Sequence, residues 1–266
     1  MTEQTQGTLA PQSKYTENKQ VNLHSVTAIK NNGAYNSDVL FPFKNIISNA
    51  QREIDHCLFS VENCQFPVSF YNITTTNNKL YYTIDAGAQA SLVITTGNYN
   101  STTLQTEILQ QLTNVGITNI SMTFSTITGK YTFTISSGEF TFYSSSTIFK
   151  ILGFVLGVNH TSVTQNLSTT YPINLLGALK LKISSQAIHI NNIDSLGAST
   201  NTLIEVPISS ANFGLILYHN ASNIYNVLNQ TSLNGIDILI MDDNSNLVNF
   251  NGQEWAMSFL IKIIYK

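Results

Sequence analysis

The sequence predicts a mainly β protein, built as an antiparallel sandwich with a small α+β module inserted into it. Three observations predict this class. Short apolar segments recur along the chain, and each is bounded by turn-forming residues. The polar residues are chiefly Asn, Ser and Thr, which favour turns and pleated strands over helices. Only one segment has clear helical periodicity.

Composition limits the classes of protein that the chain can belong to. Its 266 residues, 42% of them hydrophobic, can form one large β domain or two smaller ones. The formal net charge is -3, whereas proteins that bind nucleic acid usually carry an excess of Lys and Arg, so we expect no direct binding to a genome. We find neither a secretory signal pattern nor an apolar run of roughly 18 residues, and therefore expect folding in a cytosol-like compartment without membrane binding.

The first residues differ in composition from the rest of the chain. Residues 1–20 are mostly polar and contain almost no large apolar side chain. Such a segment buries too little surface to offset the entropy lost on ordering it. We therefore expect a flexible N-terminal arm over residues 1–20.

One persuasive helix is predicted, over Thr102–Thr113. Thr102 and Gln105 have the spacing of a capping box, and a Gly at position 116 supplies the stop. The apolar residues recur four positions apart, which is typical of a buried helix face: Leu104, Ile108 and Leu112. A further helical turn is expected over Thr147–Phe154.

Strands are expected on both sides of this helix, because apolar residues alternate and turn residues separate the segments. Residues 157–172 are predicted to form a long loop. The expected strands before the closing segment are Val21–Val26, Asp55–Val61, Phe66–Ile73, Leu80–Ile84, Ser91–Thr95, Ser121–Ile127, Lys130–Ser136, Phe140–Tyr143, Leu179–Ser184, Ala187–Asn191, Thr202–Ile208 and Phe213–Tyr218.

The chain ends in two long apolar strands, Ile236–Met241 and Trp255–Tyr265, joined by a polar turn around Asp242–Asn246. This ending is typical of the closing hairpin of a β-sandwich. We assign residues 21–75 and 173–266 to one discontinuous jelly-roll domain, and residues 76–172 to an inserted strand-strand-helix-hairpin module with its loop. Two β domains in tandem are the alternative.

The search for catalytic and ligand-binding groups is largely negative. Asp55-His56-Cys57 places a cysteine next to a histidine, the residue types of a nucleophile and its base. Successive residues of a strand point to opposite faces, so the Cys57 thiol and the His56 imidazole do not face each other. The sequence contains no Gly-rich phosphate loop and no GxSxG motif. We therefore expect no enzyme, and no catalytic, cofactor-binding or metal-ligating residue. The histidines lie one to a segment, too scattered for a metal site: His24, His56, His160, His189 and His219.

Three further features have a structural and a functional interpretation. Cys57 and Cys64 are expected to be free buried thiols, because they lack CxxC spacing and further metal ligands. The Asp242-Asp243-Asn244 turn is expected to be solvated, with a weak Ca²⁺ site as the alternative. Trp255 is expected in the core or at a subunit interface, in preference to a ligand-stacking platform.

Six short motifs carry a family resemblance, and their order and spacing matter more than any one of them. In this order the chain resembles the penton (minor capsid) proteins of virophages, polinton-like viruses and Maverick/Polinton elements, over roughly residues 66–266. The motifs are Gly97-Asn98-Tyr99, Thr128-Gly129-Lys130-Tyr131, Leu152-Gly153-Phe154, Asn174-Leu175-Leu176-Gly177, Val206-Pro207-Ile208 and the ending Asp242-Asp243…Asn251-Gly252…Trp255.

The resemblance implies a non-enzymatic structural role. It implies a homopentamer at the fivefold vertices of an icosahedral capsid, located in the virion after synthesis in the host cytoplasm or a viral factory. The implied partners are further copies of the chain, the major capsid protein, other minor or internal capsid proteins, and a host-surface receptor. The family's inserted module faces outward, and its arm reaches inward or under neighbouring subunits. The alternative is a jelly-roll host-attachment spike or carbohydrate-binding module with Tyr81, Tyr82 or Tyr143 in an exposed patch.

Overall fold

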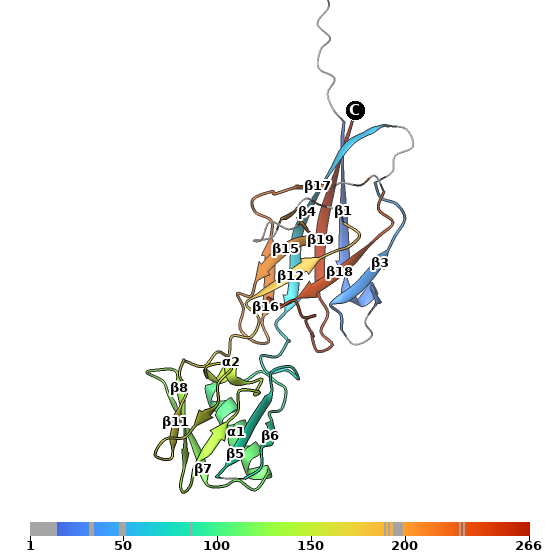
Figure 1. Ribbon diagram of the computed structural model, residues 1–266. Helices are drawn as coiled ribbons and strands as arrows, with labels where there is room; N and C mark the ends of the chain where they lie inside the picture. The colour runs from blue at the N-terminus through green and yellow to red at the C-terminus, as the bar shows by residue number, and fades with distance from the viewer. Residues whose placement is uncertain are drawn as a thin grey trace, which may run out of the picture. The chain divides into compact units, whose positions relative to one another are not determined.

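The computed structural model describes residues 15–31, 35–47, 52–85, 87–188, 190, 192–193, 199–228, 230 and 232–266. The chain divides into two compact units (Figure 1). The first combines Met1–Ser69 with Leu179–Lys266, and we call it the sandwich unit. The second is Phe70–Ala178, and we call it the inserted unit. Its limits lie a few residues outside those expected from the sequence, 76 and 172.

Two antiparallel sheets form the sandwich unit. The first sheet has the order β1 (Thr16–His24), β19 (Ala256–Tyr265), β4 (Ile54–Pro67) and β16 (Leu215–His219), and β17 (Asn226–Leu228) also pairs with β4. The second sheet has the order β15 (Thr202–Pro207), β12 (Lys180–Ser184), β18 (Gly235–Met241), β3 (Asp38–Pro42) and β2 (Ile29–Lys30). A 3-10 turn, Ser25–Thr27, links β1 to β2, and a separate pair joins β13 (Asn192–Ile193) to β14 (Ser199–Thr200).

This strand order is that of a jelly roll, because the chain passes back and forth between two sheets. It runs from β1 in the first sheet to β3 in the second, returns to β4, and crosses again to β12. The predicted fold class, a mainly β antiparallel jelly-roll sandwich, is therefore confirmed. One detail of the prediction is wrong: β18 and β19 lie in different sheets, so the closing segment is a crossing between sheets and not a hairpin.

Alternating apolar side chains fill the space between the two sheets. Ile236, Ile238 and Ile240 of β18 are fully buried, as their alternation predicts. Trp255, just before β19, is only 3% exposed and packs on Phe41 of β3 and Phe66 of β4, with ring centroids 6.1 and 5.9 Å away. Its indole Nε1–H donates to the Asn36 carbonyl at 2.6 Å, which satisfies its polar group inside the core. Trp255 is thus a core residue that joins the two sheets.

Several strand boundaries differ from those predicted. The first sheet starts at Thr16, so residues 16–20 belong to β1 and not to an arm, while residues 1–14 lie outside the described residues. β4 is one strand of 14 residues ending at Pro67, where two strands were expected. Within this strand, Asn63 pairs with Ser258 and Val61 with Phe259, so the register of β4 against β19 shifts at Glu62. The strands β3 and β17 were not predicted at all.

The inserted unit holds two smaller sheets and two helices. No helix in the described part of the chain is long and apolar enough to cross a membrane. One sheet has the order β10 (His160–Thr161), β9 (Phe140–Phe142), β5 (Lys79–Ile84) and β6 (Ala90–Val93), and the other β11 (Asn166–Ser168), β8 (Lys130–Ile135) and β7 (Ile120–Ser125). The helices are α1 (Ser101–Asn114) and α2 (Phe149–Leu152). The expected loop over 157–172 therefore contains two short strands, β10 and β11.

The start of α1 shows why the predicted capping residues were wrong. Asn100 is the N-cap, and its side-chain oxygen accepts from the Thr103 backbone N–H at 2.9 Å. The Asn100 backbone N–H donates in turn to the Thr103 hydroxyl at 2.9 Å. Asn is a stronger N-cap than Thr, so the helix begins one residue earlier than predicted. Gln105 is not a capping residue. Its side-chain amide donates instead to the Met122 carbonyl of β7 at 2.8 Å.

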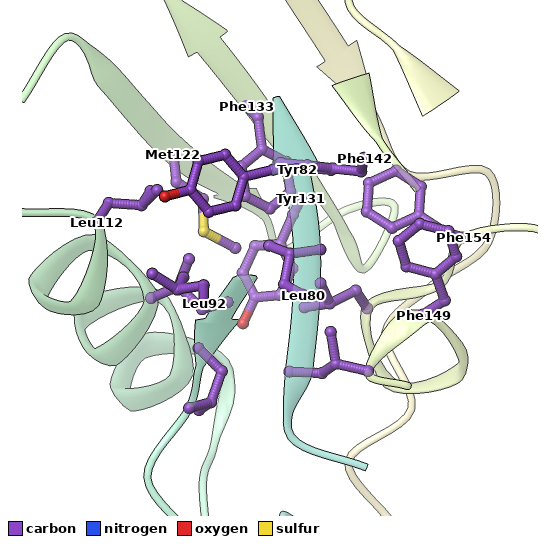
Figure 2. Packing of buried hydrophobic residues seen from close by; sticks show 14 of the residues in the cluster. Leu80, Tyr82, Leu92, Leu112, Met122, Tyr131, Phe133, Phe142, Phe149 and Phe154 are labelled. Carbon is purple, nitrogen blue, oxygen red and sulfur yellow. The ribbon is translucent and has the colours of Figure 1, made fainter. Parts of the chain in front are cut away.

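The core of the inserted unit lies between α1, α2 and the strands (Figure 2). Leu104, Ile108 and Leu112 are at most 1% exposed, so the predicted helix face is confirmed. Figure 2 shows Leu112 beside Met122 and Tyr82, and Phe142 beside Phe154 and Phe149. The rings of Phe133 and Phe142 meet edge to face with centroids 5.0 Å apart.

Candidate functional site

The histidines are not gathered into a site. Among the described residues, no group of three or more His, Cys, Asp or Glu is placed to hold a metal ion. His160 Nε2 lies 3.0 Å from the Val155 carbonyl, and His219 Nδ1 lies 2.8 Å from Asn63 Oδ1. His56 Nδ1 lies 3.1 Å from its neighbour Asp55. The remaining histidines are His24, at the exposed end of β1, and His189, which lies outside the described residues.

The two cysteines are free and buried, as the sequence predicts. Both lie on β4, and their side chains are 2% (Cys57) and 1% (Cys64) exposed. Burial raises the pKa of the Cys57 thiol, and it raises the pKa of Cys64 to about 12. Because the thiolate is the reactive form, both residues are neutral, inert core groups at physiological pH.

Alkylation tests this description of the cysteines. We expect iodoacetamide at neutral pH to leave both Cys57 and Cys64 unmodified in the native protein, because they are buried and protonated. The same reagent should label both within minutes after unfolding in denaturant. Mass spectrometry of the intact protein provides the measurement, and rapid labelling of the native protein would contradict the burial of these thiols.

The acidic turn after β18 is organised by its own hydrogen bonds. The Asp242 carboxylate accepts from the backbone N–H groups of Asn244 and Asn246, each at 2.8 Å. Asp243 Oδ1 accepts from the Leu179 N–H at 3.1 Å. The Asp242 contacts are those of a side chain that stabilises a tight turn, in which Ser245 has a φ of 64°, whereas the Asp243 contact ties the turn to the start of β12. Each carboxylate is thus used by a backbone donor close to it.

The three tyrosines of the predicted exposed patch are separated by the structure. Tyr82 is 6% exposed and lies inside the core (Figure 2), so its place in an exposed patch was wrong. Tyr81 and Tyr143 are both partly exposed and adjacent, since the Tyr143 N–H donates to the Tyr81 carbonyl at 2.9 Å. The Tyr143 hydroxyl also donates to the Thr83 hydroxyl at 3.3 Å. Only Tyr81 and Tyr143 therefore remain as a candidate contact surface for a ligand.

A run of exposed apolar residues lies on β16, β17 and their flanks in the sandwich unit. We call it the outer strip, and its members with their exposed fractions are Phe213 (81%), Leu215 (50%), Leu217 (65%), Ile224 (65%) and Val227 (47%). Their neighbours Ile216 and Leu228 are buried, at 0% and 3%. Because successive strand residues alternate between faces, Leu215, Leu217 and Val227 point away from the core. The outer strip was not predicted from the sequence.

The backbone beneath the outer strip is held by specific hydrogen bonds. The Asn220 side-chain nitrogen donates to the Ser60 hydroxyl at 2.7 Å, and its oxygen accepts from the Ile224 N–H at 3.2 Å. Phe213 has a φ of 64°, which is rare for an aromatic residue, and its N–H donates to the Val68 carbonyl at 2.8 Å. The side chains are thus exposed from an ordered backbone.

A second, smaller apolar surface lies where β1 leads into β2. Val26 is 70% exposed and Ile29 is 53% exposed, and we call these two residues the edge pair. Ile29 lies opposite Leu40 of β3 in the register. Residues 20–29 contain no Asp, Glu, Lys or Arg, and neither do residues 206–236, which include the outer strip. Both segments are therefore free of formal charge. Two lysines lie nearby: Lys30, directly after Ile29, and Lys262, whose Nζ lies 6.0 Å from the centre of the Tyr225 ring.

Comparison with solved structures identifies a similar protein. The crystal structure of the selenomethionine-labelled mavirus penton protein matches with a TM-score of 0.53 and 14% sequence identity. The match covers 93% of this chain and 100% of that chain. It confirms, at the level of the fold, the resemblance to virophage penton proteins. No family model matches the chain, and the search of curated proteins finds no match.

Proposed function

We propose that the chain is a structural capsid protein that forms homopentameric pentons at the fivefold vertices of an icosahedral capsid. The observation that carries this proposal is the extent of the fold match to the mavirus penton protein. It covers 93% of this chain, and so extends over both the sandwich unit and the inserted unit at residues 70–178. A jelly roll alone occurs in many unrelated functions, whereas a jelly roll with a matching inserted unit is far more restrictive.

The surface chemistry supports an assembly role. Large exposed apolar side chains on an ordered backbone are typical of protein contact sites. Cores of such contacts are depleted in charged residues, as residues 206–236 are. The partners in this proposal are further copies of the chain, the major capsid protein, and other minor or internal capsid proteins. The protein then resides at the capsid vertices of the virion and binds neither nucleic acid nor membrane directly.

Tyr81 and Tyr143 support a second candidate function, binding to glycans of a host surface. Both side chains are partly exposed, and the backbone of Tyr143, just after β9, is hydrogen-bonded to that of Tyr81 in β5. Two positions before Tyr143, Thr141 of β9 pairs with Thr161 of β10 in the register, and their hydroxyl oxygens lie 2.8 Å apart. Aromatic rings beside hydroxyl groups are suited to sugars, because one stacks on the ring face and the others hydrogen-bond. This candidate is a receptor contact of a vertex protein or of an attachment spike.

Particle imaging decides between a vertex and a spike. We expect a peptide tag inserted in the β7–β8 turn at Ile127, whose side chain is 95% exposed, to add density at every fivefold vertex of assembled particles. Untagged particles imaged in the same way are the control. Tag density at threefold positions or at the tips of fibres would exclude the penton and favour the attachment spike.

A further inference from the structure

We infer that the outer strip of one copy binds the edge pair of the next copy, so that the sandwich unit makes the contact that closes the ring. The inference rests on the proposed function, because it names the surfaces through which the pentamer forms. The outer strip consists of Phe213, Leu215, Leu217, Ile224 and Val227, and the edge pair consists of Val26 and Ile29.

The two surfaces lie at opposite edges of the sandwich. In the first sheet β1 is at one end of the strand order and β16 with β17 at the other. In the second sheet β2 and β15 occupy the two ends. β1 leads directly through Ser25–Thr27 into β2, and β15 leads directly into β16, so each edge combines ends of both sheets. The edge pair therefore lies at the β1–β2 edge, and the outer strip at the β15–β16 edge.

This placement is what a ring of identical subunits requires. Contacts between copies in a ring are head-to-tail, so each copy must carry two different surfaces that complement one another. A contact that pairs a surface with itself would instead stop at a dimer. The chain offers one apolar surface at each edge, and the segments that carry them, residues 20–29 and 206–236, contain no charged residue. A contact between them therefore buries few charged groups, with Lys30 and Lys262 at its rim.

A second copy fits the outer strip better than the other occupant that the chain can supply. Residues 1–14, MTEQTQGTLAPQSK, contain Leu9 and Met1 as their only large apolar side chains. These two apolar residues are eight positions apart, and Glu3 and Lys14 add charge to the segment. The two residues of the edge pair are only three positions apart, in a segment without charge. The edge pair, by contrast, is apolar, and Leu40 lies opposite Ile29 and is itself only partly buried.

Charge substitution tests the pairing of the two surfaces. Leu217→Lys places a cation in the outer strip and Val26→Glu places an anion in the edge pair. Their side chains are 65% and 70% exposed, so we expect both variants to fold. Ile127→Lys is the matched control, since it changes a 95% exposed apolar residue of the inserted unit in the same way. The readouts are the molar mass by light scattering of concentrated protein, and the occupancy of the vertices in particles assembled with each variant.

We expect each single variant to lose ring formation and vertex occupancy, and Ile127→Lys to retain both. The double variant Leu217→Lys, Val26→Glu should recover them, because each lysine then faces a glutamate of the next copy. Single variants that assemble like the wild type would overturn the inference while leaving the proposed function intact. So would loss with Leu217→Lys alone, which would assign the outer strip to another partner such as the major capsid protein. Wild-type protein absent from the vertices would instead overturn the proposed function itself.

As a second measurement, Leu217→Cys and Val26→Cys combined in one chain should give disulfide-linked species up to the pentamer under oxidation. The native Cys57 and Cys64 are buried and do not interfere. Each single cysteine variant should give no such ladder. A dimer from Leu217→Cys alone would show that the outer strip pairs with itself, and would overturn the head-to-tail contact.

Discussion

Replacing Ile108 with Asp is expected to unfold the inserted unit. Ile108 is fully buried in the middle of α1, between Leu104 and Leu112, which are at most 1% exposed. An uncompensated charge in such a position costs several kcal/mol at least, against a total stability of about 5–15 kcal/mol for a typical domain. Calorimetry should show that the unfolding transition of the inserted unit is lost, and limited proteolysis should cut within residues 70–178 first.

The exposed residue Gln110 of the same helix provides the matched control. Gln110→Asp introduces the same charge on the solvent side of α1, so it should leave the transition within a few degrees of the wild type. If Ile108→Asp behaves like Gln110→Asp, the helix face is not buried and the packing shown in Figure 2 is wrong.

The features that the sequence predicts well are local ones. The four-residue spacing of Leu104, Ile108 and Leu112 identifies the buried face of α1, because helix geometry alone places these side chains together. Alternation identifies β18 in the same way. The partner of a strand is not local, which is why β18 and β19 were predicted to form a hairpin although they lie in different sheets. Pairing depends on residues far away in the sequence.

The outer strip escaped prediction for a related reason. Leu215, Ile216 and Leu217 are three successive apolar residues, and such a run reads as a strand buried on both faces. In the structure β16 pairs with β4, and of these three residues only Ile216 is buried. The signal was present, because apolar residues on both faces of an outermost strand leave one apolar face exposed, which is typical of a contact site. The exposed face of β16 can be recognised only when the order of strands in the sheet is known, because that order shows which strands lie outermost.

Residues 16–20 were expected in a flexible arm, but they form the beginning of β1. Removing residues 1–20 should destabilise the sandwich unit by several kcal/mol, whereas a chain that starts at Tyr15 should be as stable as the whole protein. The longer deletion removes five of the nine β1 residues paired with β19, from Thr16 to Gln20. Each lost backbone hydrogen bond contributes about 1 kcal/mol net, and apolar side chains of β19 become exposed as well.

Contacts at Tyr15 and Glu17 explain why the position of the cut matters. The Tyr15 carbonyl accepts from the Tyr265 N–H at 3.0 Å, and its ring lies 5.6 Å from that of Tyr265. The Arg52 guanidinium lies 4.1 Å from the centre of the Tyr15 ring. The Tyr265 hydroxyl donates to the Glu17 carboxylate at 2.6 Å and lowers the pKa of that carboxyl below its ordinary value. The contribution of Glu17 is therefore present above its ordinary pKa and is lost as the pH falls through the lowered value.

Thermal unfolding of three chains, starting at Met1, Tyr15 and Val21, provides the measurement. The chains starting at Met1 and Tyr15 should melt together, and the chain starting at Val21 should melt many degrees lower. Equal melting of all three would mean that β1 adds nothing before Val21, as a flexible arm over residues 1–20 requires. A low melting temperature of the Tyr15 chain would instead show that residues 1–14 contribute to the fold. The result also bears on assembly, because β1 leads into the edge pair, and a weakened β1 would disturb the surface that we propose receives the neighbouring copy.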